Sequence, residues 1–214
     1  MHRLPIVVLL SLVVASCGTK PSDPSTNTPS TAASTPSTSQ EPSSKPEQHE
    51  GDTKPKEQAR AQKAIRELKT ALGGRLKQAM AEGGPTAAIE VCSKEANALT
   101  RQVAKTHNIE LGRTSHRVRN PANAPRPWVQ TWLDTFATQK ASAISPYEAA
   151  LDGNTVGYIH PIPMGGLCTA CHGDPSLISE EVKAAIAQRY PEDKATGFAI
   201  GDLRGVFWAE VPRM

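Results

Sequence analysis

The sequence of 214 residues is notable first for what it has little of. It contains four cysteines, and no second Cys-X-X-Cys pair accompanies the one at Cys168 and Cys171. Its apolar run from Leu4 to Val14 is shorter than the about 20 residues that cross a bilayer, so a transmembrane helix is not expected there. Charge is nearly balanced, with 24 Lys and Arg against 21 Asp and Glu, and the basic residues are dispersed. Nucleic acid is therefore not an expected partner.

The segment from Cys168 to His172 has the pattern Cys-X-X-Cys-His, which is typical of covalent haem attachment. Three other interpretations are a zinc half-site, a redox-active pair and a structural disulfide. Zinc needs four ligands, and the neighbours Cys171 and His172 cannot easily reach one ion together. A redox pair normally lies between a strand and a helix of a βαβ unit, and the flanks here are rich in proline and glycine. We predict one covalent haem c on Cys168 and Cys171, with His172 as an iron ligand.

The first residues have the features of an export signal. A short basic start precedes the apolar run, and Val14-Ala15-Ser16-Cys17 resembles the lipobox of bacterial lipoproteins. The alternative is an ordinary cleaved signal with an incidental cysteine. We predict a lipoprotein signal peptide over residues 1–16 and acylation of Cys17, which would anchor the protein to a membrane. The expected location is the bacterial periplasm, with the outer membrane favoured in a bacterium that has two membranes.

Residues 17–55 follow as the lipidated cysteine and a stretch dominated by Ser, Thr and Pro. Such a stretch has few apolar side chains to offset its ordering entropy, so we expect a disordered tether. Residues 56–214 are long enough for one folded domain.

Apolar periodicity in this domain predicts helices first and antiparallel hairpins later, without βαβ alternation. The expected class is α+β. The pair Gly73-Gly74 is a candidate kink in the first helix. The expected elements are helices over 57–82, 85–105, 128–136 and 177–190, a strand over 109–115, a hairpin of 147–150 with 156–162, and a closing hairpin of 198–200 with 203–211.

Five sequence blocks resemble a bacterial single-haem family whose members have a PAS-like haem c domain and occur alone or as the sensory part of histidine kinases. In chain order the blocks are 88–92, 112–115, 119–125, 168–173 and 201–205. The resemblance covers about residues 60–212. It implies a PAS-like antiparallel sheet with flanking helices. Two positions depart from the family pattern, namely His116, where an apolar residue is more usual, and Val129, where an acidic residue often stands.

The resemblance also implies an iron held by the motif histidine and by a cysteine on the opposite side, at the positions of His172 and Cys92. The sequence adds that Cys92 is the one thiol not assigned to lipid or haem, and that it lies on the apolar stripe of a predicted helix. A small core residue is the alternative interpretation of Cys92. The competing candidates for iron ligation are His160, His116, His107, Met80 and Met164.

Arg113 and Arg119 are candidate partners of the haem propionates, because a guanidinium matches a carboxylate bidentately; solvated surface arginine is the alternative. Thiolate coordination stabilises ferric iron, and two protein ligands leave no open position for a substrate. The sequence therefore favours a sensor of redox state or of a gas such as NO or CO, acting with a periplasmic redox or signalling partner. An electron-transfer cytochrome is the alternative, and a peroxidase-type enzyme is the least favoured.

Overall fold

The computed structural model describes residues 54–214. The predicted signal peptide, the acylated Cys17 and the predicted tether up to residue 53 lie outside the described residues. Within 54–214 no helix combines the length and the apolar character that crossing a membrane requires. The elements are α1 (Lys54–Lys94), α2 (Ala96–His107), β1 (Glu110–Thr114), α3 (Pro127–Phe136), β2 (Tyr147–Ala150), β3 (Thr155–Pro163), α4 (Thr169–His172), α5 (Glu180–Arg189) and β4 (Leu203–Pro212), with short 3-10 turns at Pro121–Asn123, Ala141–Ala143 and Gly166–Cys168.

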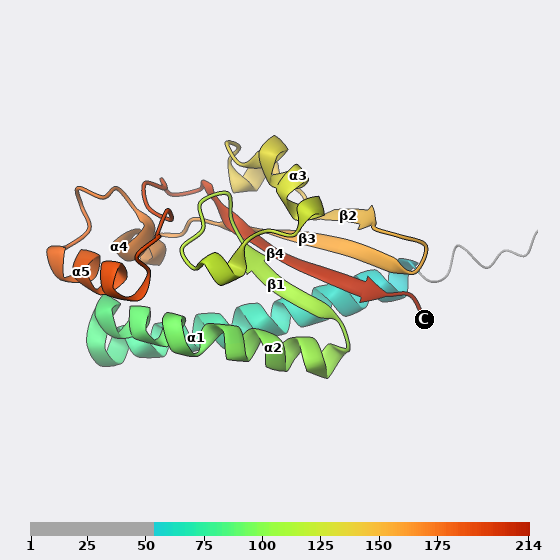
Figure 1. The fold of residues 1–214 in the computed structure, drawn as a ribbon, viewed down its shortest axis with the longest axis horizontal. Coiled ribbons are helices and arrows are strands. Elements are labelled where there is room, and N and C mark those ends of the chain that lie inside the picture. Colours follow the sequence, from blue (N-terminus) through green and yellow to red (C-terminus); the bar gives the residue numbers. More distant parts are fainter. Residues whose placement is uncertain (1–53) are drawn as a thin grey trace, which may run out of the picture. The chain divides into compact units, whose positions relative to one another are not determined.

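The four strands form one antiparallel sheet in the order β1-β4-β3-β2. Strand β4 lies in the middle and pairs with β1 on one side and β3 on the other (Figure 1). Its residues are buried almost continuously, as expected for a strand that is covered on both faces. The fold is α+β, with an antiparallel sheet and flanking helices, as the sequence predicts.

Each face of the sheet has its own core because side chains alternate along a strand. Phe207, Ala209 and Val211 of β4 face the long helix α1, where they pack against its apolar stripe and against α2. Val206 and Trp208 face the other way and pack against α3. Figure 1 shows α1 and α2 below the sheet and α3 above it.

The break between the first two predicted helices lies where the sequence places it, between residues 82 and 85, whereas the candidate kink at Gly73-Gly74 does not form. Gly73 and Gly74 remain helical, and the backbone leaves the helix at Gly83 and at Gly84, whose φ is +69°. Pro85 causes this break, because a proline disfavours the helical conformation of the residue before it. A glycine at position 84 tolerates the resulting left-handed φ. The predicted second helix begins at Pro85 as expected, but it is divided at Glu95 into the end of α1 and helix α2.

The predicted closing hairpin is wrong in its first strand. Residues 198–200 form no strand, and β4 pairs instead with β1 and β3. Since β1 and β3 occupy both edges of β4, a strand at 198–200 has no free edge of β4 with which to form a hairpin. The segment is held in other ways: Gly201 N donates to Met164 O at 2.9 Å, and Ala199 N donates to the Asp202 carboxylate at 2.7 Å.

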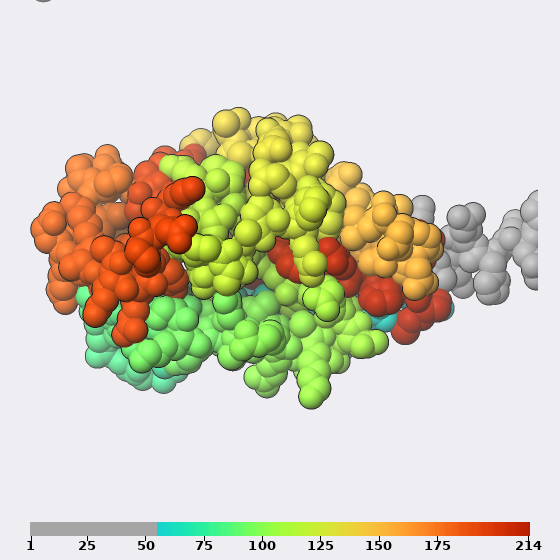
Figure 2. All heavy atoms as spheres, in the orientation of Figure 1, coloured from blue at the N-terminus to red at the C-terminus, as the bar shows by residue number. Residues whose placement is uncertain are grey.

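The end of α1 beyond the break packs on α5. Ile89 shares a buried cluster with Val182, Ile186 and Tyr190, and Cys171 packs against that cluster. Figure 2 shows the segments around α4 and α5 against this part of α1 at one end of the domain. Cys171 of the cysteine motif therefore packs beside both α1 and α5.

Candidate functional site

The largest set of chemically reactive side chains lines a cavity of about 430 Å³ at the end of the sheet where α4 and α5 lie. This volume is within the range of small-molecule and cofactor sites. Its walls come from α1, β1, the segment after β1, the cysteine motif, Tyr190 and β4. The cavity contains all three cysteines of the described part of the chain, Cys92, Cys168 and Cys171.

Local geometry explains why the motif faces this cavity. A 3-10 turn ending at Cys168 leads directly into the helical turn α4, which contains Cys171 and His172. Residues three apart on a helical turn lie on the same side, so both thiols line the cavity. Both are free thiols and half-buried. Burial raises the pKa of Cys171, so this thiol is protonated at neutral pH in the metal-free protein.

The ring of His172 is held in one orientation. Its Nδ1 lies 2.7 Å from the carbonyl oxygen of Ala195. A carbonyl only accepts, so Nδ1 carries the proton and Nε2 keeps its lone pair. Burial, followed by the charges of Arg204 and Arg119, holds the pKa of His172 well below its ordinary value. The imidazole is therefore neutral at pH 7 and offers Nε2 as a metal ligand.

Cys92 lies in α1 after the helix break and lines the same cavity as His172. Burial raises the pKa of the Cys92 thiol, and the cations Arg113 and Arg119 partly oppose that rise. The structure thus brings together His172 and Cys92, the two residues predicted to hold iron.

The other predicted candidates for iron ligation lie elsewhere, with one exception. His160 is on β3 beside Lys69 and does not line the cavity. His107 pairs with Glu67, and His116 stacks edge-on to Phe198 with ring centroids 5.5 Å apart. Met164 is buried against Ala195 and Phe198. Met80 is the exception, because it does line the cavity.

Two arginines of the cavity have no acidic partner in the described part of the chain. Arg113 on β1 and Arg204 on β4 both line the cavity, and the Nε atom of each is buried without a hydrogen-bond partner there. Burial lowers the pKa of Arg113, and it lowers the pKa of Arg204 to about 10. Buried cations without partners are costly, so these residues indicate an anionic ligand.

Sequence reasoning missed Arg204. The signal was present, because Arg204 is a charged residue between Leu203 and the apolar run from Val206 to Ala209.

Arg119, predicted alongside Arg113, also lines the cavity but has internal partners. Its guanidinium forms two hydrogen bonds of 3.1 Å with the carboxylate of Asp193. It also donates to the carbonyl oxygens of Cys171 and Ala195, at 2.5 and 3.4 Å. The assignment of Arg119 to a propionate stays a prediction, while Arg113 and Arg204 are the cavity arginines without an acidic partner among the described residues.

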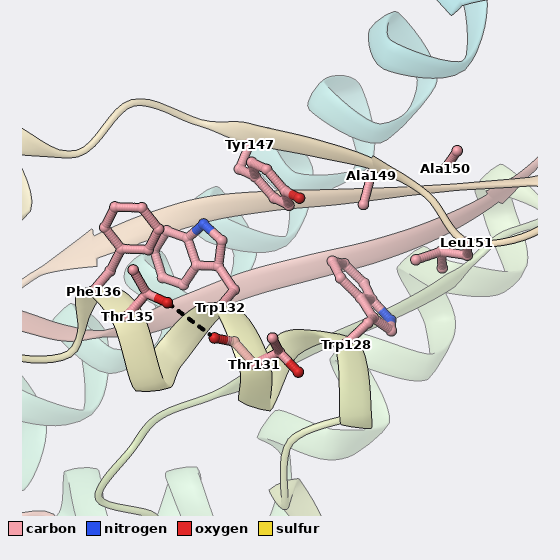
Figure 3. A pocket seen from close by; sticks show the side chains of 9 residues that line it. All are labelled: Trp128, Thr131, Trp132, Thr135, Phe136, Tyr147, Ala149, Ala150 and Leu151. Atoms are coloured by element: carbon pink, nitrogen blue, oxygen red, sulfur yellow. Dashed lines mark hydrogen bonds between the residues drawn. The ribbon is translucent and has the colours of Figure 1, made fainter.

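A second hollow, of about 420 Å³, lies between α3 and the edge strand β2 (Figure 3). Trp128, Trp132 and Phe136 extend from α3 toward Tyr147 and Leu151. All nine residues that line it are uncharged, and none is a predicted site residue.

Within residues 54–214, no three His, Cys, Asp or Glu side chains are grouped so that they could hold a metal ion. The zinc interpretation of the cysteine motif therefore gains no additional ligands from the described part of the chain.

Comparison with known proteins identifies the family. A model of the Tll0287-like family matches residues 36–212. The chain belongs to the Tll0287-like family. The crystal structure of the cyanobacterial heme-protein Tll0287 is similar over 75% of this chain and 97% of that chain, with 26% sequence identity and a TM-score of 0.58. No curated protein matches. The resemblance to a haem-protein family found in the sequence is confirmed.

Proposed function

We propose that this member of the Tll0287-like family binds haem, in a c-type attachment to Cys168 and Cys171. The observation that carries the proposal is the convergence in one cavity of the Cys-X-X-Cys-His motif, a third cysteine and two arginines without acidic partners. The similar cyanobacterial protein is a heme-protein, which supports haem as the ligand.

The residues present fit this cofactor on the chemistry of the cavity. His172 offers Nε2, because Ala195 accepts the proton on Nδ1. Cys92 offers sulfur, and metal binding deprotonates a thiol whatever its pKa in the free protein. The two thiols of the motif supply the thioether bonds. Haem carries two carboxylates, and Arg113 and Arg204 are the two cavity arginines that lack an acidic partner within residues 54–214.

When bound, haem supplies an iron that changes between the ferric and ferrous states. The chain's own residues set which state is favoured. A thiolate from Cys92 would favour ferric iron, and the cations Arg113 and Arg204 would hold the charge of the carboxylates. If His172 and Cys92 both held the iron, no position would be left open for a substrate.

On this basis we propose sensing of redox state or of a small gas such as NO or CO, in which the sulfur ligand yields to the gas. Electron transfer is the second candidate. It is favoured by Leu167, which lines the cavity and is 49% exposed, because part of the cavity rim therefore faces solvent where a partner protein can approach.

We also propose that the protein is a lipid-anchored protein of the bacterial periplasm. The support is the apolar run and the lipobox-like Val14 to Cys17. Export also places the cysteine motif in the compartment where c-type haem attachment takes place.

The haem proposal is tested by expression in a host with cytochrome c maturation machinery. We expect the denatured protein to retain a mass of one haem, and the double variant Cys168→Ser with Cys171→Ser to lose it. Wild-type protein that carries no haem from such a host contradicts the proposal. Sensing and electron transfer are then separated by optical and EPR spectra with and without NO or CO. Gas capture after reduction supports a sensor, and an unchanged ligand set supports a carrier.

A further inference from the structure

The loop between α5 and β4 is the part of the molecule that holds the imidazole of the cysteine motif. Residues 191–202 contain no strand, and their backbone bonds to the motif itself. Phe198 N donates to His172 O at 3.0 Å, and Gly197 N donates to Gly173 O at 2.7 Å. Ala195, which accepts from the His172 ring, lies in this loop and is fully buried.

The position of Ala195 is itself fixed by an ion pair. Asp193 Oδ1 accepts from Ala195 N at 2.9 Å. Arg119 binds both oxygens of Asp193 at 3.1 Å and also contacts the Ala195 carbonyl oxygen at 3.4 Å. The same guanidinium donates to the carbonyl of Cys171, which precedes His172. Arg119 therefore holds both the helical turn that carries His172 and the loop whose carbonyl orients its ring.

This ion pair is enclosed, with the side chains of Arg119 and Asp193 exposed by only 11% and 9%. Enclosed ion pairs add little net stability on average, because the desolvation of both charges offsets their attraction. What the ion pair supplies is a fixed position for the Ala195 carbonyl group. Two residues 74 positions apart hold one carbonyl at hydrogen-bond distance from one imidazole nitrogen.

We propose that Arg119 and Asp193 are positioning residues that hold the Ala195 carbonyl against Nδ1 of His172 and thereby set the donor strength of Nε2 toward the haem iron. The inference rests on the proposed haem binding. A hydrogen bond from Nδ1–H to a carbonyl makes the imidazole a stronger donor and fixes its tautomer. A stronger donor stabilises ferric iron, so the intact pair keeps the reduction potential lower than the ring alone would.

Arg117 provides a matched control. It lies two residues from Arg119 and donates to the carbonyl of Thr196, the neighbour of Ala195 in the same loop, at 2.6 Å. It does not contact the carbonyl that accepts from His172. Arg119→Lys and Arg117→Lys therefore make the same chemical change and weaken the same loop, and only the first reaches the partner of His172.

The first measurement uses haem-free protein with ¹⁵N-labelled histidine. We expect wild type and Arg117→Lys to show His172 protonated at Nδ1 alone, and Arg119→Lys to show a measurable population protonated at Nε2. Asp193→Asn should give the same result if Arg119→Lys does not fold. An unchanged tautomer in the folded Arg119 and Asp193 variants overturns the proposal, whether or not the protein binds haem.

The second measurement is the reduction potential of haem-loaded protein. We expect the reduction potential to rise in Arg119→Lys, which conserves the charge, and to stay unchanged in Arg117→Lys. Arg119→Gln separates charge from position, because loss of a nearby positive charge alone lowers the potential while loss of the hydrogen-bonded carbonyl raises it. Equal shifts in the two lysine variants, or a lower potential in Arg119→Gln, contradict the proposal. Failure of haem to attach to wild type contradicts the proposed function instead.

Discussion

Arg204 Nη2 lies 3.5 Å from Nε2 of His172, the ring nitrogen that Ala195 leaves without a proton. A guanidinium has no lone pair to offer, so Nε2 can only accept from it. In the haem-free protein this arginine therefore occupies the side of the imidazole that we assign to iron. If haem binds as proposed, we expect the Arg204 side chain to leave His172 for another acceptor, for which the haem carboxylates are suited.

The substitution Arg204→Met should have opposite effects in the two states of the protein. Without haem it removes a buried cation whose Nε has no partner, so the free energy of unfolding should rise by about 1–3 kcal/mol. With haem it removes a carboxylate partner, so the melting temperature should fall below that of loaded wild type. Calorimetry of both forms checks this, with the exposed Arg101→Met as control. A change of the same sign in both forms would exclude a role for Arg204 in binding an anion.

Replacement of Cys92 should change the iron without loss of the haem. Cys92→Ala should keep the covalent attachment but raise the reduction potential and admit exogenous ligands, because the thiolate donor is gone. Cys92→Met tests a soft donor without charge. Ferric EPR and absorption spectra are the measurement. The control is Met80→Ala, since Met80 lines the same cavity. If the spectra change in Met80→Ala and not in Cys92→Ala, the sixth ligand is methionine.

The stability of the haem-free protein should decrease on acidification through His160. Burial, and then the charge of Lys69, lower the pKa of this residue in the folded protein. The unfolded chain therefore binds the proton first as the pH falls. The contribution of His160 to the free energy of unfolding is constant above about pH 6.5. It is lost progressively below that pH, until the pH falls past the pKa that His160 has in the folded protein. Urea unfolding should show that the free energy of unfolding falls less between pH 8 and pH 5 in His160→Gln than in wild type. Equal losses for the two proteins would contradict this assignment.

Two glycine substitutions should act in opposite directions. A Cβ at Gly112 of β1 would overlap the Trp208 ring, so Gly112→Ala should lower the free energy of unfolding by about 1–3 kcal/mol. Gly74 is helical and exposed, with open space where a Cβ would stand. Gly74→Ala should therefore raise the free energy of unfolding by about 0.5–1 kcal/mol. Thermal unfolding of both variants measures the two effects. Stabilisation by Gly112→Ala would mean that the Trp208 ring can move away at little cost.

The predicted acylation of Cys17 is checked by mass spectrometry of membrane fractions. We expect the mature chain to begin at Cys17 with its acyl chains, and Cys17→Ala to be released or misprocessed. A soluble and unacylated wild-type chain in the periplasm would refute the lipid anchor.

The sequence could predict the fold where the signal was local. The apolar stripes predicted α3 and most of α1, and Asp152-Gly153-Asn154 marked the hairpin of β2 and β3. The closing hairpin failed because pairing depends on which edges are free, and both edges of β4 are occupied by strands distant in the chain. The candidate kink at Gly73-Gly74 did not form because glycine also adopts helical φ and ψ, whereas the helix boundary predicted before Pro85 did form, because a proline disfavours the helical conformation of the residue before it.

The placement of the side chains of the cysteine motif was determined by the sequence itself, because the spacing along the chain puts two thiols and an imidazole close together on the backbone. The same holds for Cys92 facing inward, which follows from helical periodicity. Only the tertiary structure decided the surroundings of His172. Ala195 and Arg204, which contact its ring, lie 23 and 32 residues away in the chain, and Arg119 and Asp193, which hold Ala195, are 74 residues apart. Such contacts depend on how the loops and β4 cross in space, and no periodicity along the chain encodes them.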